Sequence, residues 1–490
     1  MNTIQRKTMK LKTSSKALAV LLAFVMVSCD FGDINVDPNA PSVVKTDLLI
    51  TNTLRSVSDV VGGSALSGAI LTQQIAETQY DDASRYSTTT FDFNGWYTGP
   101  LMDLQTIINL NTDEATAADA LTGGSNANQI AYARIMKVYF FSMLTDRWGM
   151  IPYSAALQGT GNLRPSYDTQ EAIYTDMINE LKAAVAQIDG GAGIRGDFIL
   201  NGNMARWAQF ANSLRMKLAM RIADRNASLA SSEFASAVSA GAITADIMYP
   251  YLAEGANQNP WYGRFETRTD YAISDILADY MLPLNDYRVV RYADPTPNKS
   301  NGDGVTTFDE VVGMPYSHPN PGGIENADIS FPGIAIRAQN APLPIITVAE
   351  VHFFMAEAVE RGFISGSAAD HYRSAIEASW RQWNVYDAAN FDAFMATDAV
   401  TYSSANWKEK IGMQKWVALY PNGLEAWAEW RRLDWPQLTP HELALNPSGL
   451  IPVRHSYPTT EVQLNKENYD AAVASQGADN GDTKLWWDVN

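Results

Sequence analysis

Cys29 is the most reactive residue near the N-terminus, and it is the single cysteine of the 490-residue chain. Basic residues come first, the apolar run 17–27 follows, and Ser28 directly precedes the cysteine. A basic region, a short apolar core and small residues are the parts of a secretory signal. One cysteine cannot form an internal disulfide, and this thiol lies where a bacterial lipobox is lipidated. We expect a signal peptide over 1–28 and lipidation of Cys29; the alternative is an ordinary signal with a chance cysteine.

Aromatic side chains among polar residues are the candidates for ligand binding. Trp261 and Tyr262 lie with Arg264 in a stretch rich in Asn, Pro and Gly, and Tyr80 and Tyr86 lie in a second polar stretch. Aromatic faces stack on sugar rings, and polar neighbours supply directional hydrogen bonds. We predict that these five residues bind a ligand, either an oligosaccharide or a peptide. Trp96 and Tyr97 precede apolar residues at helical spacing and are interpreted as core or as the start of a helix.

Catalytic and metal-binding motifs are absent from the sequence. There is no nucleophile elbow, phosphate-binding loop, zinc-protease motif or dinucleotide fingerprint, and the five histidines are scattered. Residues 301–310 resemble a calcium loop around Asp303, but Lys299 stands where the first carboxylate belongs, which favours a plain turn. We expect no enzyme activity, no cofactor and no metal site. A lipid-anchored glycoside hydrolase remains an alternative, because the spacing of its two carboxylates is spatial.

The charge of the chain excludes one class of partner. The formal net charge is −18, so nucleic acid is not expected as a ligand. After Cys29 no apolar run approaches the roughly 20 residues that a membrane-spanning helix needs. The 13 Trp and 22 Tyr are compatible with a carbohydrate binder without requiring one.

Helical periodicity dominates the chain from about residue 46, which predicts a mainly α fold. Asp168 and Glu171 have the spacing of a capping box before an amphipathic helix, and apolar residues repeat at helical spacing over 207–222. Residues 349–378 resemble a tetratricopeptide unit with a turn at Gly362. We predict a helical scaffold over about 46–246 and 345–435. A tether (29–45), a loop-rich insertion (about 247–344) and an irregular C-terminal segment (about 436–490) complete the chain.

Several phrases, in their order and spacing, resemble the SusD/RagB family of nutrient-binding outer-membrane lipoproteins. They occupy 35–39, 144–153, 210–215, 356–362, 414–416, 425–432 and 451–461. Within these phrases Asp146, Arg147 and Trp148 suit the end of a helix and are interpreted as structural.

The resemblance implies a fold, a location and a partner. It implies a tetratricopeptide-like helical scaffold with a loop-rich capping subdomain. It also implies a protein without enzymatic activity, anchored by its lipid to the outer membrane at the cell surface. There it captures oligosaccharides or peptides for a SusC-like TonB-dependent transporter. A helical-repeat scaffold that binds only protein partners is a further alternative.

Overall fold

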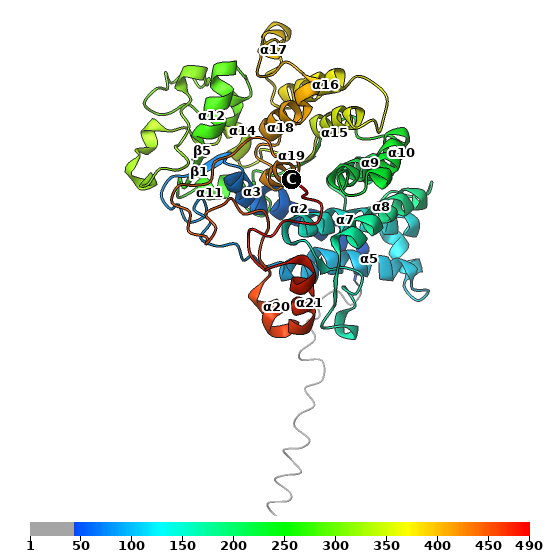
Figure 1. The fold of residues 1–490 in the computed structure, drawn as a ribbon. Helices are drawn as coiled ribbons and strands as arrows, with labels where there is room; N and C mark the ends of the chain where they lie inside the picture. The colour runs from blue at the N-terminus through cyan, green and yellow to red at the C-terminus, as the bar shows by residue number, and fades with distance from the viewer. Residues whose placement is uncertain (1–43) are drawn as a thin grey trace, which may run out of the picture. The chain divides into compact units, whose positions relative to one another are not determined.

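Helices make up most of the described chain, and consecutive helices pack against each other in pairs (Figure 1). The computed structural model describes residues 44–490, so the signal peptide, Cys29 and nearly all of the tether lie outside the described residues. The main pairs are α7 (Asn126–Trp148) with α8 (Gln170–Gln187), α9 (Met204–Arg221) with α10 (Ala227–Ala240), and α15 (Val348–Glu360) with α16 (Ala368–Gln382). This arrangement confirms the mainly α, tetratricopeptide-like fold.

The other α-helices connect and cover these pairs. They are α2 Thr46–Ser58, α3 Ala65–Leu71, α4 Asn94–Trp96, α5 Met102–Thr112, α6 Ala117–Ala120, α11 Pro260–Phe265, α12 Asp275–Met281, α13 Val289–Tyr292, α14 Ile334–Arg337, α17 Ala388–Met395, α18 Trp407–Ala418, α19 Gly423–Leu433, α20 Thr459–Leu464 and α21 Lys466–Gln476. The helices within residues 247–344 are all short and are separated by loops and short strands. The C-terminal segment, expected to be irregular, contains α20 and α21. No helix within 44–490 combines the length and apolar character that a membrane crossing requires.

The tetratricopeptide-like unit forms as its sequence predicts. Gly362 follows α15 with a φ of +72°, a conformation that glycine adopts without steric cost, so the chain turns there into α16. Tyr372 and Ile376 of α16 are fully buried, on the face that packs against α15.

The start of α8 differs from its prediction by one residue. Thr169 is the N-cap, and its hydroxyl accepts a hydrogen bond from the Ala172 N–H. Asp168 instead lies in strand β3 (Tyr167–Asp168), where its carboxylate accepts from the backbone N–H groups of Tyr153 and Ser154. The carboxylate therefore stabilises the preceding loop, and the shorter Thr side chain caps the helix.

Three two-stranded antiparallel sheets join distant segments. β1 (Ile75–Glu77) pairs with β5 (Tyr271–Ile273), and β2 (Ile151–Pro152) pairs with β3. β4 (Ile247–Tyr249) pairs with β6 (Leu343–Ile346) through a bulge. The β1–β5 pair attaches the loop-rich segment 247–344 to the N-terminal helices. In its register Glu77 of β1 lies opposite Tyr271 of β5.

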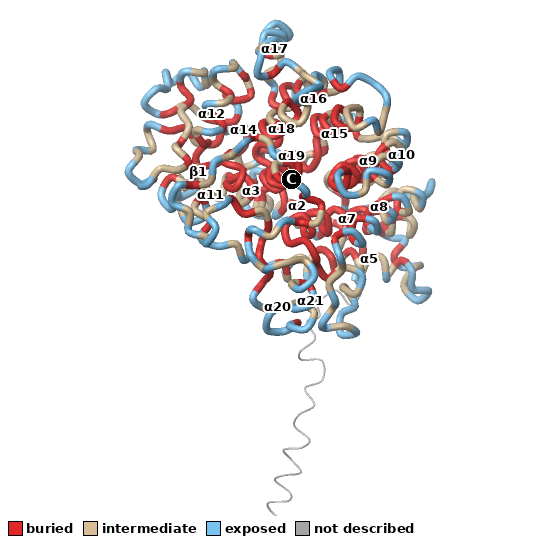
Figure 2. The backbone as a smooth tube through the Cα atoms, viewed as in Figure 1, coloured by how far each residue is buried: buried red, intermediate tan, exposed pale blue. Residues whose placement is uncertain are grey.

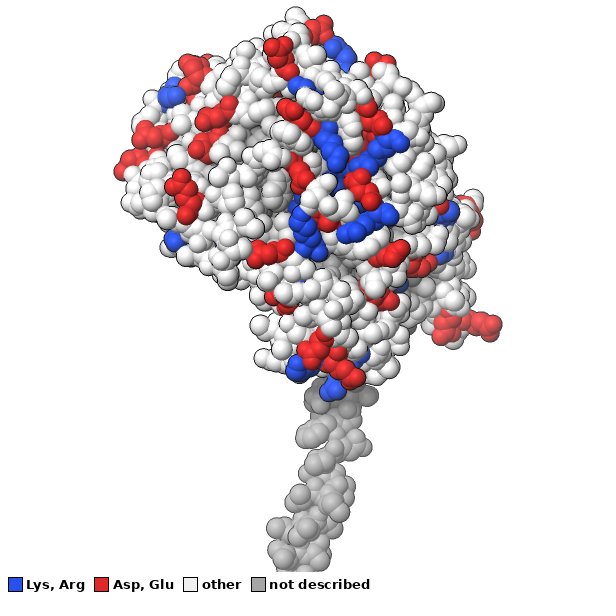
Figure 3. All heavy atoms as spheres, viewed as in Figure 1, with Lys and Arg blue, Asp and Glu red and all other residues white. Residues whose placement is uncertain are grey.

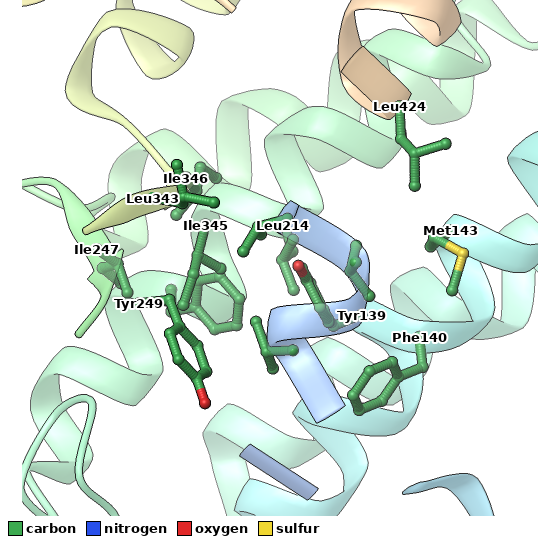
Figure 4. Close-up of a cluster of buried hydrophobic side chains, with 14 of the residues drawn as sticks. Tyr139, Phe140, Met143, Leu214, Ile247, Tyr249, Leu343, Ile345, Ile346 and Leu424 are labelled. Carbon is green, nitrogen blue, oxygen red and sulfur yellow. The ribbon is translucent and has the colours of Figure 1, made fainter. Parts of the chain in front are cut away.

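The hydrophobic core follows the inner faces of the helix pairs, with exposed residues concentrated in the connecting loops (Figure 2). Figure 4 shows one part of it, where Tyr139 of α7 lies near Leu214 of α9 and Ile345 of β6. The small sheet β4–β6 is thus packed onto the helical scaffold by apolar contacts.

Helices α3 and α19 approach each other through two glycines. A Cβ on Gly423 would lie 2.0 Å from the backbone nitrogen of Ala69, and a Cβ on Gly68 would lie 2.2 Å from the carbonyl oxygen of Gly423. Only glycine fits at this crossing, because backbone atoms cannot move aside as a flexible side chain can. The crossing fixes the position of α3, which forms part of the candidate site.

Buried charges link α7, α9, α18 and α19. The guanidinium of Arg221 pairs with Asp146, Glu425 and Glu429, and the carboxylate of Glu429 also accepts from the Lys415 Nζ at 2.7 Å. Buried ions are tolerated when they are paired in this way. On the face shown in Figure 3, acidic side chains are scattered, and Lys and Arg gather around the C-terminus.

Candidate functional site

A cavity of about 300 Å³ lies among five segments of the chain. These segments are the end of the π-helix Asp59–Ser64 with α3, the loop 83–91, the end of α7, β5 and the C-terminal loop 452–455. The lining residues are Gly63, Ser64, Leu66, Ser67, Ile70, Leu71, Ala83, Tyr86, Thr88, Thr89, Phe91, Arg147, Tyr271, Pro452 and His455. Ala83 and Thr88 are exposed, whereas Tyr86, Arg147 and His455 are buried, so the latter form the inner wall.

Hydrogen bonds hold the loop that forms the mouth. The Glu77 carboxylate accepts from the backbone N–H of Ser84 at 2.8 Å and from its hydroxyl at 2.7 Å. Burial raises the pKa of Glu77, and the hydrogen bonds from Ser84 oppose that rise. Tyr86 has a φ of +60°, and its phenol oxygen accepts from the His441 N–H at 3.1 Å. The loop is therefore anchored both to β1 and to the C-terminal segment.

The inner wall joins the loop 88–91 to the C-terminal loop. The Ser456 N–H donates to the carbonyl of Thr89 at 2.8 Å, and the His455 N–H donates to the carbonyl of Arg147 at 2.8 Å. The His455 ring is stacked between Phe91, at a centroid distance of 4.1 Å, and Trp427, at 4.9 Å. The Phe91 ring therefore covers the imidazole of His455 and also lines the cavity.

A second cavity of about 480 Å³ adjoins the first. Its lining is Ser56, Asp59, Gly63, Ser64, Asp92, Gly95, Trp96 and Pro100, so the two cavities share Gly63 and Ser64. Trp96 is half-buried at the end of α4 and its ring packs near Phe140. The interpretation of Trp96 as a core residue at the start of a helix is thus incomplete, because it also faces this cavity.

Trp261, one of the five residues predicted to bind a ligand, is buried. Its side chain has no exposed surface and belongs to the main core, in α11. The Asn259 side chain caps α11 and also donates to the carbonyls of Ile336 and Ala341, and Pro260 packs against Gly62. These long-range contacts seat α11 on the π-helix, and no face of the indole is open to a ligand.

Of the other four predicted site residues, Tyr86 and Arg264 lie at the cavities, whereas Tyr80 and Tyr262 line neither of them. Tyr86 lines the first cavity, and Arg264 donates from Nη2 to the carbonyl of Gly63 at 3.0 Å, behind the wall that the cavities share. Tyr80 is 61% exposed, and the guanidinium of Arg268 lies 5.0 Å from its ring centroid. Tyr262 is half-buried and lines neither cavity. A binding role for these residues stays a prediction.

The segment 301–310 forms hydrogen-bonded turns. The Glu310 carboxylate accepts from the N–H groups of Asn301 at 2.9 Å and Thr307 at 2.8 Å, and Asp303 accepts from the Val305 N–H. Over residues 44–490 no group of three His, Cys, Asp or Glu side chains is placed to hold a metal ion. His352 and His371, far apart in sequence, meet with their Nδ1 atoms 3.2 Å apart.

Four residues that line the first cavity were not predicted from the sequence as site residues. Phe91 and Tyr271 belong to no motif of the sequence analysis, and His455 lies within the phrase 451–461 without a role assigned to it. Arg147 was interpreted only as a residue at the end of a helix. The cavity that brings them together depends on contacts between segments hundreds of residues apart.

Comparison with known proteins supplies the family and the fold. Residues 38–458 match a SusD-like family model described as starch-binding and associating with the outer membrane. A solved chitin-binding protein is 25% identical, with 91% of this chain and 100% of that chain covered and a TM-score of 0.77. A SusD homologue from Bacteroides fragilis is 24% identical, with 91% and 100% covered and a TM-score of 0.79. A chitin-binding SusD homologue from Flavobacterium johnsoniae is 24% identical, with 91% of this chain and 98% of that chain covered and a TM-score of 0.71. No curated protein shows a significant match.

Proposed function

The chain belongs to the SusD-like family, and on that premise we propose that it is a lipid-anchored surface protein that captures an oligosaccharide for import. The proposed recipient is a SusC-like TonB-dependent transporter in the outer membrane. The family description supports the ligand class and the membrane association. The name of the chitin-binding relative at 25% identity supports a sugar over a peptide, which remains the alternative ligand.

The cavity beside α3 is the observation that carries this proposal. Phe91 and Tyr271 bring aromatic rings to its lining, and hydroxyl groups of Ser64, Ser67 and Thr89 stand among them. Apolar rings combined with a few directed polar groups are the composition of small-ligand sites, and sugars present both an apolar face and hydroxyls. The adjoining cavity with Trp96 extends the site for a longer oligosaccharide.

Binding without turnover is the proposed activity. Two of the solved relatives are named as chitin-binding proteins. A binder leaves the oligosaccharide intact and raises the melting temperature of the protein by ligand linkage. Incubation with an oligosaccharide panel, followed by chromatography of the sugar, tests this. Shortened products would favour the hydrolase alternative.

Affinity measurements on cavity variants test the site. We expect Tyr271→Ala to weaken oligosaccharide binding in titration calorimetry by about 2 kcal/mol, the loss typical of an aromatic residue that dominates a binding site. Tyr386→Ala is the matched control, because Tyr386 is also half-buried but lies near α17, outside both cavities. Equal affinities of the wild type and Tyr271→Ala would remove this cavity from the proposal.

Co-purification tests the proposed partner. A lasting interface buries on the order of 2,000 Å² or more, so the complex should survive mild detergent extraction from the native cells. We expect an outer-membrane transporter to elute together with the protein in size-exclusion chromatography. Recovery of the protein alone under several mild detergents would contradict the partnership.

A further inference from the structure

A buried guanidinium without an anionic partner stands at the inner wall of the cavity. Arg147 is 5% exposed and lines the cavity. Within residues 44–490 no carboxylate lies within 4.0 Å of its nitrogens. Its recorded side-chain contacts are neutral: Nε donates to His455 Nδ1 at 3.3 Å, Nη1 approaches Met143 Sδ at 3.5 Å, and the guanidinium lies over the Trp148 ring at 4.4 Å. Burial lowers the pKa of Arg147 to about 9.

His455 lies beside Arg147 in the same wall and brings no negative charge to it. Burial and the charges of Arg147, Arg431 and Arg454 hold the pKa of His455 well below its usual value, so the ring is neutral. Because Nδ1 accepts from Arg147, the proton resides on Nε2. That Nε2 is buried and has no hydrogen-bond partner.

Two further arginines lie beside His455. Arg454 pairs with the Asp479 carboxylate at 2.9 Å. Arg431 donates from Nη1 to the carbonyls of Asp146 and Val453, each at 2.8 Å. Three guanidiniums therefore surround His455. Arg147 and Arg431 both lack a paired carboxylate among the described residues, and of these two Arg147 is the one that lines the cavity.

We infer that the ligand group seated in this cavity carries a carboxylate, and that Arg147 selects it. A buried charge without a counter-ion is costly, and an anion that enters the cavity removes that cost while forming charge-assisted hydrogen bonds. The inference rests on the proposed oligosaccharide-binding function and narrows its ligand to an acidic sugar, a uronate.

The dimensions and lining of the cavity favour a sugar ring as the carrier of the carboxylate. A volume of about 300 Å³ is at the lower end for small-molecule sites, which suits one ring and not a whole chain of sugars. Phe91 and Tyr271 supply apolar surface for the sugar ring. Thr88 and Thr89 supply hydroxyls at the mouth for the sugar units next to that ring.

Matched ligands test the inference on the unaltered protein. The full chain, purified in mild detergent, is titrated with galacturonate oligomers and with the same oligomers after reduction of each carboxyl to an alcohol. We expect the reduced oligomers to bind roughly 10- to 100-fold more weakly, as expected for loss of a hydrogen bond to a charged group. Equal affinities would overturn the inference.

Substitutions assign the effect to Arg147. Arg147→Gln should lose the preference for the charged oligomer, and Arg147→Lys should retain part of it. Arg373→Gln, on the exposed face of α16, should leave the preference unchanged. Without ligand, the melting temperature of Arg147→Gln should be no lower than that of the wild type, because the variant removes an unpaired buried charge. A preference that survives in Arg147→Gln would overturn the assignment.

Two further outcomes separate this inference from the proposed function. Binding of neutral malto- or chito-oligosaccharides with no binding of uronates would overturn the inference and leave the proposed function intact. Binding of peptides with a free C-terminal carboxylate, but of no oligosaccharide, would overturn both.

Discussion

The ionisation of two glutamates in α15 should affect the free energy of unfolding in opposite directions as the pH rises. Glu350 and Glu357 lie two helical turns apart and are 3% and 0% exposed. Burial, with the charge of Glu425 nearby, raises the pKa of Glu350 from 4.5 to about 7. The pKa of Glu357 is lowered, although burial opposes this, because Arg432 and Arg361 pair with its carboxylate.

The magnitude for Glu350 follows from its pKa. Below pH 4.5 its carboxyl is protonated in both the native and the unfolded state, and the favourable contribution of the native site is fully present. As the pH rises toward 7 the unfolded chain loses the proton first, and the native state loses stability. One pKa unit corresponds to about 1.4 kcal/mol, so about 3 kcal/mol is lost by pH 8.

Urea unfolding of the wild type and of Glu350→Gln at pH 4.5 and pH 8 measures this loss. Comparing the two proteins at each pH cancels the titration of all other groups. We expect Glu350→Gln to gain about 3 kcal/mol relative to the wild type between pH 4.5 and pH 8. The amide oxygen still accepts from the Thr347 N–H, so the cap of α15 is kept.

Glu357→Gln is the matched control. It should be less stable than the wild type at pH 8 by about 3 kcal/mol, because Arg432 and Arg361 lose a buried partner. That deficit should shrink as the pH falls below 4.5, because the unfolded wild-type chain then takes up the proton before the native carboxylate does and the wild type loses stability. A difference between wild type and Glu350→Gln that does not vary with pH, or that grows on acidification, would refute the reasoning.

Three further changes have defined outcomes. Gly423→Ala should lower the unfolding free energy by at least about 2 kcal/mol, since its Cβ would meet the backbone of Ala69, while Gly190→Ala, which has open space around it, should be neutral in the same urea titration. Asp197→Ala removes the acceptor of three backbone N–H groups and one indole N–H, and a loss of at least about 2 kcal/mol is expected in thermal unfolding; an unchanged melting temperature would contradict it. Cys29→Ala should release the protein from membranes with an unchanged melting temperature, and an unaltered membrane fraction on centrifugation would disprove lipidation.

Helical periodicity and turn residues are local properties, and they were sufficient to predict much of the scaffold. The apolar spacing over 207–222 predicted α9, and the small residues around Gly362 predicted the α15–α16 pair. Each helix depends mainly on hydrogen bonds and side chains within a few residues of one another. The cap of α8 was misplaced by one residue because Asp168 has a stronger use in the loop before it.

The candidate site depended on contacts that no local pattern records. Trp261 has the polar neighbours of a binding residue, yet Asn259 ties its helix to carbonyls 77 and 82 residues away, and the indole is buried. Arg147 and His455 are 308 residues apart and meet at one wall of the cavity. Residue types and periodicity determine which segments become helices. The content of Trp and Tyr is compatible with a carbohydrate binder. Burial and charge pairing are decided by the packing of distant segments, because a side chain's exposure depends on what the rest of the chain places over it.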